Sequence, residues 1–298
     1  MTAPAPERTL HPRPSQASVY PHFSMKRVLT AVVLIPLVLL LIFKAPFWLI
    51  TPVVGLVAEL ALWEYLTLAD ASGAKTPRIA AVVGVALLFL CVFYRPELLA
   101  QLLGAIALAL LIVSAFRSPL KRVLPDAAYS MFGVLYVGLT LATLPLISAQ
   151  ENGPSLLLFL FFVVWAGDIA ALYVGRTLGK KKLAPSISPG KTWEGTIASV
   201  VGSLIIALLL VLLAAALARR NIEALFYPGS IARWLFLALL LNIAAQVGDL
   251  VESAIKRGAG VKDSGALLPG HGGILDRIDA LLLAAPVLWY ALLAQQTF

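Results

Sequence analysis

The sequence predicts an all-α, polytopic integral membrane protein, built as a bundle of about nine transmembrane helices with a cytoplasmic N-terminus. Of its 298 residues, 60% are hydrophobic and 13% are charged, whereas a typical soluble domain has about 25% charged residues. Apolar stretches recur along the chain, and none alternates with period two as a strand of a membrane barrel would. Because backbone in lipid must satisfy its own hydrogen bonds, we expect these stretches to be helices.

The chain begins with a segment that the composition marks as different from the rest. Residues 1–24 contain five prolines and few large hydrophobic residues, so we expect a disordered cytoplasmic tail. No convincing small-residue cleavage site follows the first apolar stretch, so we interpret it as a permanent helix and not as a secretory signal. Most of the nine stretches approach the ~20 residues that cross a membrane, and the first and third are short; they lie at residues 28–43, 47–68, 79–94, 98–116, 128–147, 155–175, 196–218, 231–248 and 275–294.

The basic residues predict the orientation of these helices. With the N-terminus in the cytoplasm, 18 of the 23 Lys and Arg residues fall on the cytoplasmic side, as the positive-inside rule requires. The net charge of +8 is then explained by topology and by attraction to anionic headgroups, so nucleic acid is not an expected partner. The single cysteine, Cys91, excludes a disulfide framework and a cysteine-rich zinc site.

Polar residues concentrate in two connections, which we predict to be long cytoplasmic loops at residues 176–195 and 249–275. Long loops in a compact bundle usually bind or gate something. Four aspartates lie close to these connections and near one predicted depth, namely Asp168, Asp249, Asp276 and Asp279. Carboxylates at bilayer depth are costly and need partners, and they suit Mg²⁺ together with substrate phosphates. A set of ion pairs is the competing interpretation.

Helical spacing groups further side chains with Asp249. If the helix continues past Asp249, then Glu252, Ser253 and Lys256 follow on the same face. That face would carry a metal ligand, a hydroxyl and a cation. The alternative is a network of side chains, three and four residues apart, that solvates the end of a helix.

Two glycine-containing strings have a phosphate-binding interpretation. Residues 269–273, PGHGG, lead into the last apolar stretch, where free N–H groups and the helix dipole favour an anion; a plain glycine turn is the alternative. Residues 188–192, SPGKT, contain the Gly-Lys-Thr of a Walker loop but lack its earlier glycine, and we predict no strand before them. Trp193 is either an interfacial anchor or a base-stacking residue. Glu64, near the inner boundary of the second stretch, either joins the site or lies at the interface.

The string from Ser253 to Asp279 resembles the signature of phosphatidate cytidylyltransferases, also called CDP-diacylglycerol synthases. The segments that carry the resemblance are SAIKR at residues 253–257, KDSG at 262–265 and LPGHGGILDRID at 268–279. Upstream, Gly167-Asp168, Gly175-Arg176 and SPGKTWEG at 188–195 are similar to the family's second motif region. In chain order, we call residues 167–195 the first motif region of this chain and residues 249–279 the second. The strong similarity covers roughly residues 165–280, whereas the first 150 residues match only as apolar spans.

The resemblance implies a homodimeric enzyme of the inner membrane that makes CDP-diacylglycerol and pyrophosphate from CTP and phosphatidic acid, with Mg²⁺ and an active site facing the cytoplasm. Residues 25–150 would be N-terminal transmembrane helices, and residues 151–298 a transmembrane catalytic region. Asp249 and Asp276 match the family's metal-binding aspartates, with Asp168 and Asp279 as further candidate ligands of one or two cations. Lys256, Arg257 and Lys262 are expected to clamp phosphates, and the expected substrate-binding residues are Ser188, Lys191, Thr192, Ser253, Asp263, Gly270, His271, Gly272, Gly273 and Arg277.

Two other classes of protein remain open. A secondary transporter or channel also carries intramembrane acids beside glycine-broken segments, but it would distribute those acids through the membrane depth. A CTP-dependent polyprenol kinase would share CTP and magnesium while lacking the full motif. Only the favoured activity moves cytidine onto a lipid.

Overall fold

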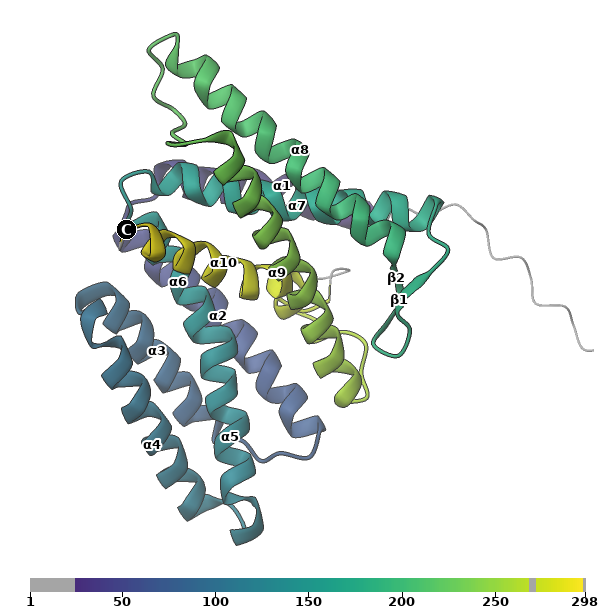
Figure 1. Ribbon diagram of the computed structural model, residues 1–298. Coiled ribbons are helices and arrows are strands. Elements are labelled where there is room, and N and C mark those ends of the chain that lie inside the picture. Colours follow the sequence, from purple (N-terminus) through teal and green to yellow (C-terminus); the bar gives the residue numbers. More distant parts are fainter. Residues whose placement is uncertain (1–24, 268–271, 297–298) are drawn as a thin grey trace, which may run out of the picture.

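The computed structural model describes residues 25–267 and 272–296 as a bundle of helices with one small hairpin (Figure 1). Its helices are α1 (Met25–Lys44), α2 (Phe47–Ala71), α3 (Arg78–Tyr94), α4 (Leu99–Arg117), α5 (Val123–Gly133), α6 (Thr140–Ser148), α7 (Gly153–Thr177), α8 (Trp193–Ala218), α9 (Ile231–Gly258) and α10 (Leu275–Gln296). Short 3₁₀ turns, η1 (Pro96–Leu98) and η2 (Leu120–Arg122), precede α4 and α5, and a π-helical turn, η3 (Val134–Leu139), joins α5 to α6. The two strands are β1 (Lys182–Ala184) and β2 (Ser188–Thr192).

All nine predicted apolar stretches are helical, which confirms the fold class. Within the described residues, seven helical segments are long and apolar enough to cross a membrane, with α5, η3 and α6 forming one of them. The two shorter apolar helices are Ile35–Lys44 and Arg78–Tyr94, which correspond to the first and third stretches, the two expected to be short. The predicted tail at residues 1–24 lies outside the described residues.

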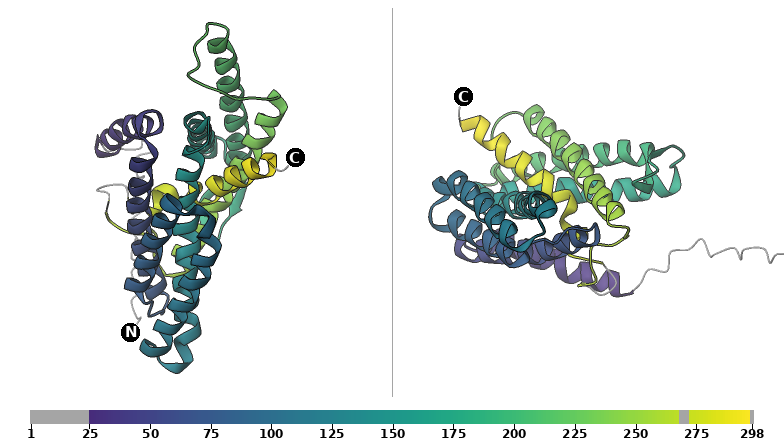
Figure 2. Two further views of the ribbon diagram at one scale, coloured as in Figure 1. Left: turned by 90° about the vertical axis from the view of Figure 1, so that its left-hand side faces the viewer. Right: turned by 90° about the horizontal axis from the view of Figure 1, so that it is seen from below.

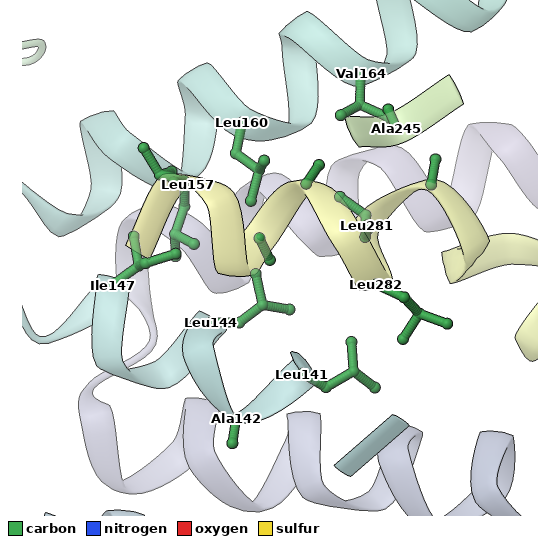
Figure 3. Close-up of a cluster of buried hydrophobic side chains, with 14 of the residues drawn as sticks. Leu141, Ala142, Leu144, Ile147, Leu157, Leu160, Val164, Ala245, Leu281 and Leu282 are labelled. Carbon is green, nitrogen blue, oxygen red and sulfur yellow. The ribbon is translucent and has the colours of Figure 1, made fainter. Parts of the chain in front are cut away.

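The helices form two groups, α2 to α6 and α7 to α9, and α10 packs against both. In both views of Figure 2, α3 and α4 lie at one side of the molecule and α8 at the other. Figure 3 shows α10 between the groups, with Leu281 and Leu282 surrounded by apolar side chains of α6, α7 and α9, among them Leu141, Leu160 and Ala245. Leu282 and Leu141 are almost fully buried. Since residue 276 lies at the start of this helix, the packing of α10 fixes where the second motif region enters the bundle.

A buried carboxylate, that of Asp126, contacts two connections of the bundle. Asp126 at the start of α5 is fully buried and accepts hydrogen bonds from the Lys75 backbone N–H at 3.0 Å and the Ser118 hydroxyl at 2.7 Å. The Arg122 guanidinium lies 3.3 Å from the same carboxylate. Asp126 therefore joins the α2–α3 connection to the α4–α5 connection.

We expect Asp126→Ala to lower the free energy of unfolding by about 2 kcal/mol, because two partly buried hydrogen bonds and an ion pair to a buried carboxylate would be lost. The exposed Arg95–Glu97 pair, 3.6 Å apart, provides the control: Glu97→Ala should change stability little. Thermal unfolding of both variants in the same detergent measures the difference. Equal midpoints for the two variants would contradict this role of Asp126.

Candidate active site

The first motif region is a hairpin and not the loop expected from the sequence. β1 pairs antiparallel with β2, with Lys182 opposite Thr192 and Ala184 opposite Ser188. The prediction that no strand precedes the SPGKT string is therefore wrong, since β1 precedes it and the string itself is β2. The hairpin holds Lys191 so that its Nζ lies 2.7 Å from Asp249 Oδ2. An ion pair thus joins the two motif regions.

The second motif region begins on a helix. α9 continues to Gly258, and Gly260, at a φ of +72°, lies in the left-handed region just after it. The connection between α9 and α10 is therefore shorter than the predicted loop at 249–275. The helix continues past Asp249, as the prediction of one polar face required. The contacts along that face are the network of side chains four residues apart that was the alternative: Ser253 Oγ donates to Asp249 Oδ1 at 3.4 Å, and Lys256 Nζ lies 2.5 Å from Glu252 Oε2.

Asp276 is committed to other groups of the protein. Lys256 Nζ donates to its Oδ1 at 2.6 Å, while the backbone N–H groups of Ser264 and Gly273 donate to its Oδ2 at 3.0 and 2.9 Å. Both carboxylate oxygens therefore already accept hydrogen bonds or an ion pair. No contact between described residues joins Asp276 to Asp249, so the sharing of a metal by these two aspartates stays a prediction. Lys256, which we predicted to bind phosphates, forms ion pairs with Asp276 and Glu252.

Glu64 of α2 lies in this site, which answers the choice that the sequence left open. Its side chain is only 4% exposed. Its Oε1 accepts the Ile274 N–H at 3.0 Å, and its Oε2 accepts the Leu275 N–H and the Ser264 hydroxyl, both at 2.9 Å. Of the predicted phosphate-binding string 269–273, residues 269–271 lie outside the described residues. The N–H groups of residues 273–275 donate to Glu64 and Asp276.

Three carboxylates from three helices act on one another at this end of the bundle. The charge of Asp249 on α9 acts on Asp168 of α7 and on Asp279 of α10, and Asp168 also acts on Asp279. Such repulsion is unfavourable unless a cation offsets it. Within the described residues, however, no three His, Cys, Asp or Glu side chains converge closely enough to hold a metal ion. We call Asp168, Asp249 and Asp279 the aspartate triad. Their donor chemistry suits a divalent cation if one or two of them bind it together with phosphates and water, as Mg²⁺ is usually bound.

A buried polar network positions two helices of the triad. Asn242 Nδ2 donates to the hydroxyls of Ser199 and Ser203, both at 2.8 Å, and Gln246 Nε2 donates to Asn242 Oδ1 at 2.6 Å. A Cβ on Gly167 would lie only 2.6 Å from Asn242 Nδ2, so the glycine before Asp168 permits this close approach. The sequence analysis missed this network, although Asn242 and Gln246 are spaced by one helical turn.

Tyr136 is a second residue that the sequence analysis missed. It lies on the π-helical turn η3, is 5% exposed, and its hydroxyl has no hydrogen-bond partner within the described residues. The charges that act on it include those of Glu252, Asp279 and Asp249. π-Helical turns occur frequently at functional sites. No sequence signal marks such a turn here.

The other predicted site residues have mixed outcomes. Thr192 is buried and caps α8, its Oγ1 accepting the Gly195 N–H at 3.2 Å. Arg257 donates to the backbone carbonyls of Ile187 and Val261, at 3.3 and 2.9 Å, and so contacts the hairpin. The roles predicted for these two side chains in substrate binding stay predictions. Gly272 has a φ of +78° and lies beside Asp276, whereas Gly270 and His271 lie outside the described residues; Ser188 is half-buried, and Lys262, Asp263 and Arg277 are exposed.

Comparisons with known proteins identify the family of this chain. The sequence profile of the cytidylyltransferase family matches residues 25–294. A phosphatidate cytidylyltransferase of Haemophilus influenzae is 34% identical over 292 residues, covering 89% of this chain and 97% of the relative. One of Staphylococcus saprophyticus is 36% identical over 239 residues, covering 78% and 85%. One of Brucella suis is 46% identical over 160 residues, and that match spans about half of each chain, 53% and 54%. The chain belongs to the cytidylyltransferase family.

Proposed function

We propose that this membrane protein transfers the cytidylyl group of CTP to phosphatidic acid, giving CDP-diacylglycerol and pyrophosphate. The observation that carries the proposal is the Lys191–Asp249 ion pair, because it joins the two motif regions, 58 residues apart, into one polar site. The family membership and the names of the relatives support the same activity. An oxygen of the lipid phosphate attacks the α-phosphorus of CTP, and the bond from that phosphorus to the bridging oxygen breaks as pyrophosphate leaves.

The main task of the site is to bring two anions together. Lys191 and Lys256, with side chains 23% and 12% exposed, are the cations that the fold holds nearest to the acidic groups. They would exchange their carboxylate partners for phosphate oxygens and so offset the repulsion between the substrates. A phosphate monoester is already ionised near neutral pH, since its second pKa is about 6. No strong base is therefore assigned to His271 or to any other residue.

A divalent cation, for which Mg²⁺ is our proposal, would be held by one or two carboxylates of the aspartate triad together with substrate phosphates. Asp168 and Asp249 come from the two motif regions, and Asp279 comes from the first turns of α10. When bound, such a cation supplies charge neutralisation to the phosphates. Asp276 differs from our sequence-based expectation: its two oxygens are engaged by Lys256 and by backbone N–H groups, so we assign it to the support of the site.

The location and assembly of the enzyme follow from the same proposal. The apolar helices allow the acyl chains of phosphatidic acid to stay in the bilayer while the headgroup enters the polar site. CTP would arrive from the cytoplasm if the basic residues face that side, as the positive-inside rule predicts. We accordingly propose an inner-membrane protein with a cytoplasmic active site that works as a homodimer.

The product formed from labelled CTP tests the proposed function. Purified protein in detergent, given phosphatidic acid, Mg²⁺ and CTP labelled in the cytosine ring, should yield a labelled lipid on thin-layer chromatography. CTP labelled in the γ-phosphate should give labelled pyrophosphate and no labelled lipid. Transfer of the γ-phosphate to a polyprenol would instead establish a kinase, and the absence of any labelled lipid would favour the transporter class.

A further inference from the structure

Glu64 lies outside both motif regions, on α2 in the N-terminal half of the chain, yet its carboxylate contacts the second motif region. Within the described residues, three groups donate hydrogen bonds to it, and all belong to that region: the Ser264 hydroxyl and the N–H groups of Ile274 and Leu275. Ser264 is 5% exposed and Leu275 is fully buried, so these bonds are shielded from water. Shielded bonds to a charged acceptor are stronger than exposed ones.

Glu64 and Asp276 hold the same segment from two sides. The side chain of Ser264 donates to Glu64, while its backbone N–H donates to Asp276 at 3.0 Å. Ile274 and Leu275 donate to Glu64, and Gly273 directly before them donates to Asp276 at 2.9 Å. Asp276 in turn contacts Lys256 at 2.6 Å. A displacement of Ser264 or of residues 273–275 would therefore move Asp276 and also Lys256, which contacts Asp276.

The chemistry at Glu64 requires a carboxylate. Three donors converge on its two oxygens, whereas a glutamine has one acceptor oxygen and would turn its NH₂ group toward at least one of these donors. The negative charge also lies at the N-terminus of α10, where the helix dipole stabilises it. Packing is close as well, because a Cβ on Gly273 would collide with Ser264 Oγ and Glu64 Oε2.

We infer that Glu64 is a positioning residue of the enzyme: from α2 it holds the start of α10, and so sets the Asp276–Lys256 pair at the geometry that the reaction needs. The inference rests on the proposed function for its kinetic consequence. Its structural part, that Glu64 shields the N–H groups of residues 274 and 275, can be tested without any activity.

Amide hydrogen exchange of the full chain in detergent tests the structural part. Glu64→Gln should speed exchange at Ile274 and Leu275 about tenfold or more, because a hydrogen bond worth about 1.4 kcal/mol changes an equilibrium tenfold. Glu64→Asp, which keeps the charge on a shorter stem, should give a smaller increase. Glu59→Gln is the matched control, since Glu59 is also on α2 and its oxygens accept no hydrogen bond within the described residues. Its exchange at 274 and 275 should equal that of the wild type.

Steady-state kinetics test the positioning role. Glu64→Gln should lower kcat about 30-fold while KM for CTP changes less than about threefold, because misplacement of supporting groups is felt in the transition state. Glu64→Asp should recover part of kcat. Ser264→Ala removes one of the three donors and keeps the backbone contact to Asp276, so it should lower kcat only about threefold; it serves if Glu64→Gln does not fold.

Distinct results would overturn each part. Unchanged exchange at 274 and 275 in both Glu64→Gln and Ser264→Ala would refute the contacts. Faster exchange with wild-type kcat would show that Glu64 supports structure alone, and an equal loss of kcat in Glu59→Gln would show that α2 acts without specificity for position 64. If the wild-type protein makes no CDP-diacylglycerol, the proposed function fails, while the exchange experiment still decides whether Glu64 holds the start of α10.

Discussion

The Asp276→Asn variant is expected to transfer cytidylyl groups about a hundredfold more slowly than the wild type, the scale of loss seen when groups around a reacting centre are misplaced. An asparagine has one acceptor oxygen and cannot serve Lys256 together with the N–H groups of Ser264 and Gly273. Lys256 would keep only Glu252 as its described partner. Because Asp276 supports the site in our proposal, the magnesium concentration for half-maximal activity should stay within about twofold of the wild-type value.

Initial rates of cytidylyl transfer across a range of Mg²⁺ concentrations measure both quantities. Glu223→Gln is a suitable control, because Glu223 is an exposed carboxylate in the connection between α8 and α9. It should leave the rate and the magnesium requirement unchanged. A large rise in the magnesium requirement of Asp276→Asn would restore the metal ligand that the sequence predicted.

Asp249→Asn should show the opposite pattern, with a magnesium requirement raised about tenfold or more, the effect expected when a carboxylate that holds a cation is neutralised. Asp249 is the member of the aspartate triad whose charge acts on both others. Asp168→Asn should shift the requirement in the same direction. The rate at saturating Mg²⁺ should recover part of its loss in both variants.

The ion pair with Lys191 must be separated from the proposed cation site, because Asp249→Asn alters both. Lys191→Met removes the 2.7 Å contact and keeps the carboxylate. We expect it to raise KM for CTP and to leave the magnesium requirement unchanged, since it removes a phosphate-neutralising charge and no metal ligand. Unchanged magnesium dependence in both Asp249→Asn and Asp168→Asn would contradict the assignment of the cation to this triad.

The fold could be predicted from the sequence because hydrophobic length is a local property. Each apolar stretch reports its own helix, and even the two short members were recognised from their residue counts. The hairpin could not be predicted in this way: β1 and β2 have only three and five residues, and neither alternates polar and apolar side chains. Contacts with Asp249 and α9 hold them, and such contacts are invisible in a local pattern.

The sequence predicted several residues of the candidate site, but not which groups they contact. The sequence identified Asp249, Asp276 and Lys191 as functional candidates, but it could not show that Lys256 and two backbone N–H groups contact Asp276. The metal-binding role predicted for Asp276 stays a prediction. Glu64 is harder still, since its partners lie 200 or more residues away along the chain. No periodicity connects positions so distant, and only tertiary packing brings them together.

The hydrogen bonds from the start of α10 to Glu64 on α2 also limit how segments of this chain can be exchanged with those of other proteins. The half that carries the motifs does not contain every group on which its geometry depends, because one carboxylate comes from the other half. A hybrid protein that joins residues 151–298 to a foreign N-terminal half should therefore lose activity to about the extent expected for Glu64→Gln, unless the donor half supplies an acid at the place of Glu64. The N-terminal and C-terminal halves therefore depend on each other, and neither can be exchanged between proteins by itself without this loss.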